Sequence, residues 1–367
     1  MKIKELLPSF FVVGVRDLRK PDLVKSFLKQ YPVPGLALFN APFESPENIW
    51  KDADTGAEIF FEFIRSLEEQ IKFFSVDQEG GRVQRLRSPF VRIPSAKKIG
   101  EVLEDYDRTD LIFEFYRLAA QQFRVSNISL NFAPVCDLRT ENSNDMVIGD
   151  RSFSDRLDRV IHLTKIFCEA FESEGIHTTL KHFPGHGSSG IDSHDGIAIL
   201  QKTKEEIKHT DTRIFKETAG TASCIMTAHI AFPEEPERIF SLDKLYLEEF
   251  RKEMPQHLRW LTDDLATMKA VSDRQPWIHG LELGYDHLLL CGNLDQAAKA
   301  IEESIRHFES KNFDFQTSME WELKSRHAQE AFAKNLHLSK FKTWLKEMKV
   351  LEAKASDILE QMKVEVS

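Results

Sequence analysis

The densest group of reactive side chains lies in residues 181–194, which have the sequence KHFPGHGSSGIDSH. Lysine, histidine and aspartate side chains stand here beside serine hydroxyls, directly after a short apolar run. The proline and the glycines of this segment oppose a regular helix or strand, so a loop is predicted. Reactive groups on a loop are typical of an active site. The segment is therefore predicted to carry the chemistry of the protein.

Two pairs of residues in this loop also have simpler interpretations. Taken alone, a pair such as Asp192 and His194 is more often an Asx turn beside a surface histidine than an acid–base pair. His182 and His186 have the i, i+4 spacing of a zinc-binding helix, but a proline and a glycine between them interrupt such a helix. Metal binding is therefore not expected at this pair.

Short apolar runs alternate with amphipathic stretches along most of the chain, which is typical of repeated βα units and a parallel sheet. One amphipathic stretch, residues 58–71, has its apolar residues at helical spacing. Eight strands alternating with helices over about 300 residues predict an α/β fold, a (β/α)8 TIM-type barrel. The strands are expected at residues 10–15, 35–39, 72–76, 128–132, 176–180, 223–227, 258–262 and 287–290.

Polar residues follow these apolar runs at or just beyond the carboxyl end of each expected strand. Barrel enzymes assemble their active sites at this rim, so these residues are candidates for a pocket. They are Asp77, Asp137, Lys181, His182, His229, Asp263 and Asn293.

The pattern changes in the last part of the chain. Residues 311–367 are rich in lysine and glutamate, with aromatic and aliphatic residues at intervals. We expect residues 1–310 to form the catalytic barrel and residues 311–367 to form a C-terminal helical extension packed on it.

Composition excludes several classes of partner. The 367 residues carry a net charge of −10 and contain no block of lysine and arginine, so nucleic acid is not an expected partner. No apolar run is long enough to span a membrane. The apolar N-terminal stretch is interrupted by Pro8 and Ser9 and leads to Arg16 and Asp17, so it is interpreted as the first strand and not as a signal peptide. A cytoplasmic monomer is expected.

The four cysteines lack the paired spacing of a zinc site or a redox motif. They are expected to be buried free thiols in a reducing compartment. They stand at Cys136, Cys168, Cys224 and Cys291.

Several motifs together resemble those of glycoside hydrolase family 3, and the resemblance is closest to the single-domain bacterial β-N-acetylglucosaminidases of peptidoglycan recycling. It covers about residues 8 to 300, and motifs in a fixed order are far more specific than any one motif alone. Besides residues 181–194, the motifs are residues 76–85 (VDQEGGRVQR), 131–137 (NFAPVCD), 148–153 (IGDRSF) and 262–265 (TDDL).

The resemblance implies a retaining glycoside hydrolase that uses no cofactor and no metal. Retaining hydrolysis needs a carboxylate nucleophile and a separate proton donor. Asp263 matches the family's nucleophile, and His194 matches the histidine that donates the proton in this branch of the family. Asp192 would hydrogen-bond one ring nitrogen of His194 and favour its protonated form. The glycines at 185, 187 and 190 predict that this dyad lies on a mobile loop.

The resemblance also implies a sugar substrate, a terminal nonreducing β-linked N-acetylglucosamine on a muramic-acid-containing fragment of peptidoglycan. Charged groups at the end of a pocket suit a ring rich in hydroxyls, although an arginine at the rim, such as Arg151, also fits a structural ion pair. The residues that match the family's sugar-binding positions are Asp77, Arg85, Arg151, Lys181 and His182.

The chain departs from the family pattern in two places. Ser188 and Ser189 replace the usual Asp-Thr, and residues 197–200 replace the usual Leu-Pro. Both departures lie outside the proton donor, so they bear on loop packing and on the fit of the leaving group.

Three neighbouring residues have structural interpretations. Glu79 is expected to anchor backbone at the rim, or else to take part in the pocket. Asp264 is expected to cap a following helix while Asp263 faces the pocket. His229 fits either a pocket residue or a hydrogen bond beneath the pocket floor.

Two other functions fit some of these residues. A metal-dependent hydrolase on the same barrel would use His182, His186, His229 and an aspartate. A sugar-binding protein that has lost catalysis would keep the pocket alone, although the presence of Asp263, Asp192 and His194 counts against it.

Overall fold

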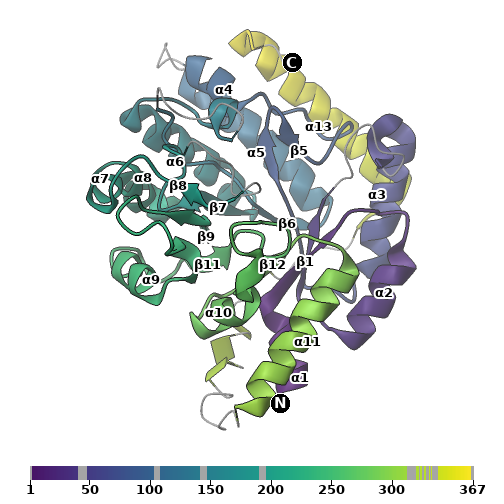
Figure 1. Cartoon of the computed structure of the whole chain (residues 1–367). Helices are drawn as coiled ribbons and strands as arrows, with labels where there is room; N and C mark the ends of the chain where they lie inside the picture. Colours follow the sequence, from purple (N-terminus) through teal and green to yellow (C-terminus); the bar gives the residue numbers. More distant parts are fainter. Residues whose placement is uncertain are drawn as a thin grey trace.

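The structure is a computed structural model that describes residues 2–39, 48–102, 108–140, 147–189, 196–311, 320–321, 323–324, 326–327, 330, 332 and 338–364. A parallel eight-stranded sheet lies at its centre (Figure 1). Its strands are β1 (Phe11–Val15), β2 (Gly35–Leu38), β3 (Phe73–Val76), β6 (Ile128–Asn131), β7 (His177–Phe183), β9 (Cys224–Thr227), β11 (Arg259–Thr262) and β12 (Leu288–Leu290).

The sheet closes into a barrel. Its strands lie in the order β11, β9, β7, β6, β3, β2, β1 and β12. A parallel bridge between Leu261 and His287 joins the two ends of this order, and the Thr262 amide donates to the His287 carbonyl at 3.2 Å. The predicted (β/α)8 barrel is therefore confirmed, and each of the eight expected runs overlaps one strand.

Strand β7 is longer than predicted. It continues to Phe183, so Lys181 and His182 belong to the strand and not to the loop. The backbone of this extension is paired on both sides, because the Lys181 amide donates to the Pro134 carbonyl at 3.3 Å and the Phe183 carbonyl accepts from the Ala228 amide at 2.8 Å. This pairing fixes both reactive side chains on the rigid part of the barrel.

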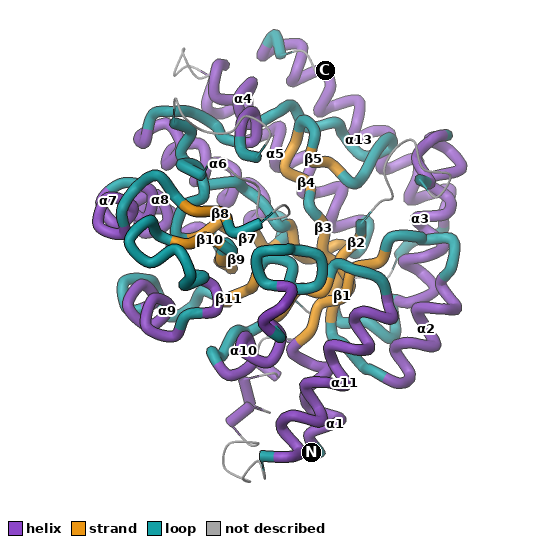
Figure 2. Tube along the Cα trace, viewed as in Figure 1, coloured by secondary structure: helices purple, strands orange, loops and turns teal. Residues whose placement is uncertain are grey.

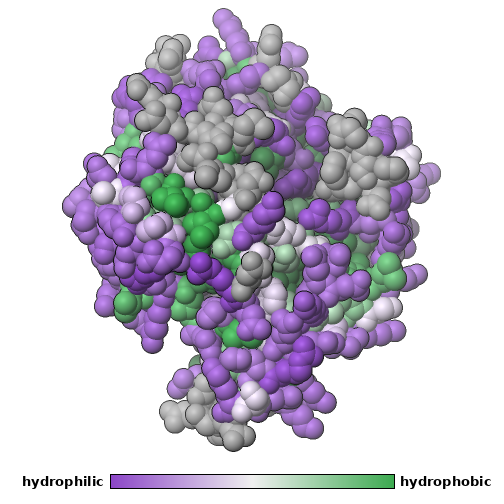
Figure 3. Space-filling view, viewed as in Figure 1, coloured by the Kyte–Doolittle hydropathy of each residue, from purple (hydrophilic) through white to green (hydrophobic). Residues whose placement is uncertain are grey.

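The helices surround the barrel strands (Figure 2). Hydrophilic residues cover most of the face seen in Figure 3, as expected for helices that bury one side against a sheet. The helices are α1 (Ile3–Leu6), α2 (Pro21–Gln30), α3 (Ala53–Leu67), α4 (Ala96–Val102), α5 (Thr109–Val125), α6 (Leu157–Ser173), α7 (Lys204–His209), α8 (Asp211–Thr218), α9 (Lys244–Arg251), α10 (Pro276–Glu282), α11 (Leu294–Ser310) and α13 (Phe341–Met362).

Local sequence signals explain where two of these helices begin. The Asp52 side chain accepts a hydrogen bond from the Thr55 amide at 2.8 Å, so α3 starts before the apolar pattern of residues 58–71. Asn293 forms a capping box with Gln296 at the start of α11. Asn293, a candidate pocket residue by its position after a strand, therefore has a structural role.

Apolar side chains fill the interior of the barrel, as in other barrels whose lumen is a packed core. Val12, Leu130 and Leu261 are among the buried residues of this cluster. Phe332, far along the chain, is buried with them, and its ring lies 5.1 Å from that of Phe73.

The C-terminal helix α13 packs on the outside of the barrel against α3 and α5 (Figure 1). Trp344 is fully buried there; its ring stacks on Phe60 with centroids 6.1 Å apart, and its indole nitrogen donates to the Ser126 hydroxyl at 3.1 Å. Gln122 of α5 donates to the Met348 carbonyl of α13 at 3.1 Å. The predicted helical extension is thus present, while the domain boundary between residues 310 and 311 stays a prediction.

All four cysteines are buried and free, as predicted. Burial raises the pKa of each thiol, which keeps it protonated and unreactive. Within the described ranges, no helix has the length and apolar character needed to cross a bilayer.

Candidate active site

A pocket of about 620 Å³ opens at the carboxyl ends of the barrel strands. Its size is within the range of ligand-binding pockets. Arg16 follows β1, Asp77 follows β3, Asp263 follows β11 and Cys291 follows β12, and all four line it. The pocket therefore lies at the rim that the sequence predicts.

A small hairpin, β4 (Gln78–Gly80) and β5 (Val83–Gln84), carries one wall of the pocket. Gln78 fixes it to the barrel, because its backbone amide donates to the Asn131 side chain at 3.1 Å and its side-chain oxygen accepts from the Arg85 amide at 2.9 Å. Gly80 has a φ of +119°, and a Cβ there would lie 2.2 Å from the Pro94 carbonyl oxygen. The glycine of this motif is therefore required for close packing.

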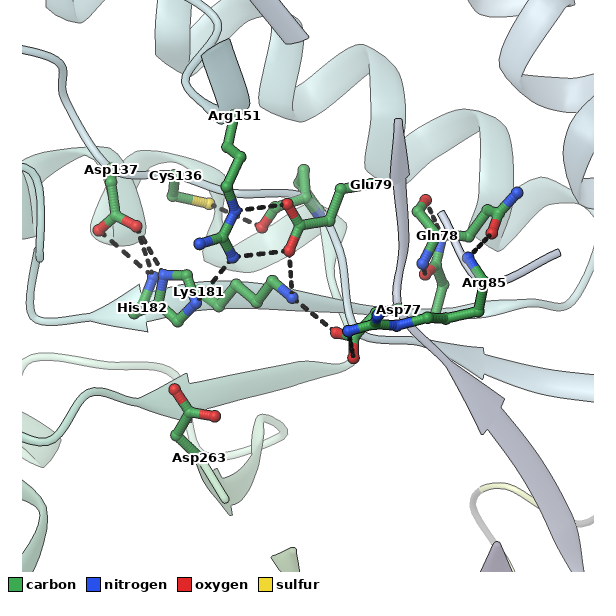
Figure 4. Close-up of polar contacts among 12 residues, drawn as sticks. Asp77, Gln78, Glu79, Arg85, Cys136, Asp137, Arg151, Lys181, His182 and Asp263 are labelled. Atoms are coloured by element: carbon green, nitrogen blue, oxygen red, sulfur yellow. Dashed lines mark hydrogen bonds and ion pairs between the residues drawn. The ribbon is translucent and has the colours of Figure 1, made fainter. Parts of the chain in front are cut away.

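An ion-pair network crosses the pocket between this hairpin and β7 (Figure 4). Lys181 Nζ lies 2.8 Å from Asp77 Oδ1 and 2.6 Å from Glu79 Oε1. Arg151 makes a two-pronged contact with Glu79, with Nε to Oε2 and Nη2 to Oε1 both at 2.8 Å. Arg85 Nη2 lies 3.8 Å from Asp77 Oδ2.

The network keeps its members charged although it is buried. Burial alone would raise the pKa of Glu79, but the charges of Arg151 and Lys181 lower it far below its usual range. Burial alone would lower the pKa of Lys181, but the charges of Asp77 and Glu79 raise it. Glu79 therefore orients two cations that line the pocket, which fits the second of its two expected roles, taking part in the pocket.

Asp137 organises the beginning of the 181–194 segment. It is fully buried; its carboxylate lies 2.7 Å from Nδ1 of His182 and accepts from the His186 amide at 2.6 Å. A carboxylate can only accept, so Nδ1 carries the proton and the other ring nitrogen faces Arg151 Nη2 at 3.4 Å. Burial would raise the pKa of Asp137, but its electrostatic interaction and hydrogen bond with His182 lower it. Asp137 thus fixes the ring of His182.

Asp263 stands at the end of β11 with its carboxylate directed toward His182 (Figure 4). Its backbone amide donates to the Thr227 carbonyl at 3.2 Å, and its Oδ1 accepts from the Asp264 amide at 2.8 Å. Within the described part of the chain, no lysine or arginine forms an ion pair with it. Burial would raise the pKa of Asp263, but electrostatic interactions with His182 and His229 and the hydrogen bond from the Asp264 amide lower it, so the carboxylate is ionised.

The residues beneath Asp263 hold its backbone in place. Asp264 accepts from the Ala266 amide at 2.9 Å and from the Cys291 amide at 2.7 Å, so it closes a turn and ties β11 to the end of β12. The predicted helix cap is wrong, because a turn and not a helix follows Asp264. His229 is buried and bonds the Asp264 carbonyl at 3.1 Å and the Ser241 hydroxyl at 2.6 Å, which places it under the floor.

The loop after β7 is packed tightly up to Ser189. A Cβ on Gly185 would lie 2.4 Å from Asp211, and a Cβ on Gly187 would lie 1.9 Å from the Leu138 carbonyl oxygen. These glycines permit close approach in the described part of the loop, while the mobility of the segment that carries the dyad stays a prediction. Gly190 lies outside the described residues.

The two residues of the predicted acid–base dyad, Asp192 and His194, also lie outside the described residues. The structure does describe Ser188 and Ser189, where the chain departs from the family pattern. Ser189 bridges to Leu200, so it packs against the second departing segment, residues 197–200. Their shared contact is consistent with the predicted effect on loop packing.

Several pocket residues were absent from the sequence-based candidates. Arg16 donates to the Cys291 carbonyl at 2.9 Å, and the Arg85 guanidinium lies 5.0 Å from the centre of the Phe39 ring. Arg16 follows the first strand, so the strand-end rule could have found it. Phe39, Met226 and Met268 also line the pocket, but no local signal separates such apolar residues from core.

The metal-dependent alternative has little support in this geometry. His229 uses both ring nitrogens in hydrogen bonds within the protein, and His182 uses Nδ1 on Asp137. Among the described residues, no group of three or more histidine, cysteine, aspartate or glutamate side chains is arranged to hold a metal ion.

A closed parallel barrel with a charged pocket at the carboxyl ends of its strands defines a barrel enzyme. Residues 1–323 match the glycosyl hydrolase family 3 N-terminal domain. A β-hexosaminidase of Haemophilus influenzae is 33% identical over 281 residues, which cover 74% of this chain and 76% of the relative. A β-hexosaminidase of Tolumonas auensis is 36% identical over 236 residues, which cover 63% of this chain and 69% of the relative.

Solved structures share the fold. A family 3 β-N-acetylglucosaminidase from Paenibacillus has a TM-score of 0.79 and 24% identity, with 98% of this chain and 69% of that chain covered. Native NagZ from Neisseria gonorrhoeae has a TM-score of 0.74 and 21% identity, with 95% and 97% covered. The chain belongs to glycoside hydrolase family 3, and the resemblance inferred from its motifs is confirmed.

The network predicts a specific effect of removing the charge of Glu79. We expect Glu79→Gln to lower the free energy of unfolding by about 3–5 kcal/mol at neutral pH, because it leaves Arg151 without its carboxylate partner and Lys181 with Asp77 alone. The low native pKa of Glu79 stabilises the fold above the carboxyl's ordinary pKa of 4.5, and this contribution is lost as pH falls below that value. The difference between the two proteins should therefore shrink in acid.

Denaturant unfolding at several pH values measures this difference. Glu58→Gln, at an exposed position on α3, is the matched control and should change stability by less than about 0.5 kcal/mol. Equal stability of the wild-type protein and Glu79→Gln at neutral pH would contradict the structural role of the network.

Proposed function

We propose that this protein is a retaining β-N-acetylhexosaminidase that removes terminal nonreducing β-N-acetylglucosamine, with Asp263 as its nucleophile. The observation that carries the proposal is the charge and the surroundings of the Asp263 carboxylate. Its carboxylate is ionised, lines the pocket and has no lysine or arginine ion-pair partner among the described residues. A carboxylate neutralised by an ion pair would be a weaker nucleophile.

The charged wall opposite Asp263 suits the hydroxyls of a sugar. Asp77 offers carboxylate acceptors, while Lys181 and Arg85 offer donors, and the ion pairs among them fix their positions. His182 is fixed by Asp137 and lines the same pocket. Arg151 contributes mainly through its contact with Glu79, so we assign it to shaping the pocket beside the sugar.

The proposed reaction has two steps. Asp263 attacks the anomeric carbon, and the bond to the leaving oxygen breaks as His194 gives that oxygen a proton. Water then attacks the glycosyl–enzyme bond, His194 takes a proton from the water, and Asp263 leaves as a carboxylate. Asp192 orients the His194 ring. The roles of His194 and Asp192 rest on the family resemblance.

We propose a muramic-acid-containing fragment of peptidoglycan as the natural substrate. The resemblance to the recycling enzymes supports this choice, and the similarity to β-hexosaminidases at 33% and 36% identity supports the amino sugar. The pocket volume accommodates one sugar ring with room at its mouth for a leaving group.

The assignment of N-acetylglucosamine as the sugar predicts selectivity at position 2 of the ring, for an acetamido group over a hydroxyl. An aryl β-N-acetylglucosaminide should be hydrolysed with a kcat/KM at least about 100-fold above that of the aryl β-glucoside, because a site built for the acetamido group leaves polar groups unpaired without it. Steady-state rates with the same nitrophenol leaving group measure this ratio. A glucoside cleaved equally well would overturn the sugar assignment.

The same assay separates the alternatives. Absence of turnover with binding of N-acetylglucosamine would indicate a sugar-binding protein that has lost catalysis. Loss of turnover after treatment with a chelator, with recovery on adding a metal ion, would indicate the metal-dependent hydrolase.

The assignment of His194 as the proton donor predicts that the loss of activity on its removal depends on the leaving group. His194→Ala should lower kcat/KM by about 100-fold or more for a disaccharide, whose departing oxygen is basic, and far less for a nitrophenyl glycoside. Asp192→Ala should show the same pattern more weakly. His209→Ala, at an exposed position ending α7, is the control and should leave both rates unchanged. Equal losses on both substrates would contradict an acid role for His194.

A further inference from the structure

A second cleft adjoins the active-site pocket. It has a volume of about 520 Å³ and shares Arg82 and Arg87 with the pocket, so the two spaces lie side by side. Its other lining residues are Gly81, Arg92, Ser95, Lys97, Lys98, Glu101 and Asp150. No residue assigned to catalysis or sugar binding lies in it.

The cleft is cationic on a chain that is acidic overall. Five arginines and lysines line it against two carboxylates, whereas the whole chain has a net charge of −10. Arg82 pairs with Asp150 at 3.1 Å, so these two charges offset each other. Among the described residues, no carboxylate lies within ion-pair distance of Arg87, Arg92 or Lys97. The cleft therefore concentrates positive charge beside the mouth of the pocket.

Backbone contacts hold the arginines in place. The Val91 amide donates to the Gln122 side chain at 2.7 Å, and the Ile93 amide donates to the Gln84 side chain at 2.8 Å. Phe90 between the arginines is buried, and its ring lies 6.4 Å from that of Trp344 in α13. The segment bearing Arg87 and Arg92 is thus clamped between the hairpin, α5 and α13.

The two arginines lie within each other's electrostatic field. Burial, and then the charge of Arg92, lower the pKa of the Arg87 guanidinium. The fixed backbone keeps the two like charges close together, so they repel each other. An anion bound between them lowers this repulsion. The arrangement is therefore prepared for an acidic group.

We propose that this cleft is a subsite for a carboxylate on the leaving-group side of the substrate, bound by Arg87, Arg92 and Lys97. The inference rests on the proposed function, because it assumes that the sugar occupies the adjoining pocket. A muramic acid residue carries a carboxylate on its lactyl ether; a peptide attached there converts this carboxylate into an amide and brings carboxylates of its own. Guanidinium groups bind carboxylates through paired hydrogen bonds, which gives such a subsite its selectivity.

The test compares substrates that differ in the group on the lactyl carboxyl. The first is N-acetylglucosaminyl-β-1,4-N-acetylmuramic acid, the second is its methyl ester, and the third carries a peptide on the lactyl group. We expect the acid to exceed the ester in kcat/KM by about tenfold at low salt, because each exposed charge contributes about a factor of two to five. The advantage should fall as salt is raised.

Variants of the cleft test whether it causes the higher kcat/KM of the acid over the ester. Arg92→Gln with Lys97→Gln should remove most of the preference for the acid and leave the ester rate unchanged. Lys244→Gln, at an exposed position on α9, removes a charge elsewhere and should change neither rate. Thermal unfolding of each variant verifies that the fold is retained.

The outcomes are distinguishable. A preference for the acid that the double variant removes supports the subsite, and a preference seen only with the peptide-bearing substrate assigns it to peptide carboxylates. Equal rates for all three substrates, or a preference unaffected by the double variant, would overturn the subsite while the proposed function stands. Failure to hydrolyse every substrate would overturn the proposed function, and the subsite with it.

Discussion

The buried contact of Glu79 with Lys181 and Arg151 is the interaction on which the site depends. It joins three parts of the chain, the hairpin after β3, the segment before α6 and strand β7, at one point of the rim. The attraction between its charges offsets the cost of taking them out of water, and each fixed charge then orients the next. The pocket is therefore shaped before a sugar enters it.

Asp263 is held on a separate support. Its strand is tied to β9 through the Thr227 carbonyl and to β12 through Asp264, while His229 braces the turn from below. Asp263 and the charged wall thus come from different strands of one closed barrel, β11 for Asp263 and β3 and β7 for the wall. A closed barrel keeps the distance between them fixed, which is what orientation of a sugar against a carboxylate requires.

Much of this arrangement could be predicted from sequence, because strand periodicity and the strand-end rule are local signals. They located all eight strands and placed Asp77, Lys181 and Asp263 at one rim. The errors came from contacts between distant segments. The pairing of β7 with residues 133–136 lengthened that strand, and the partners that decide between the two expected roles of Glu79 lie about 70 and 100 residues away.

The measurement that most directly tests the central claim is covalent trapping of the enzyme with a fluorinated N-acetylglucosaminyl donor, followed by mass spectrometry of its peptides. The account predicts one sugar attached to Asp263, and no attachment to the Asp263→Asn variant, because retaining hydrolysis passes through a glycosyl–enzyme bond. A sugar attached to another carboxylate, or steady hydrolysis of the donor without any attachment, would contradict the assignment of Asp263 as the nucleophile.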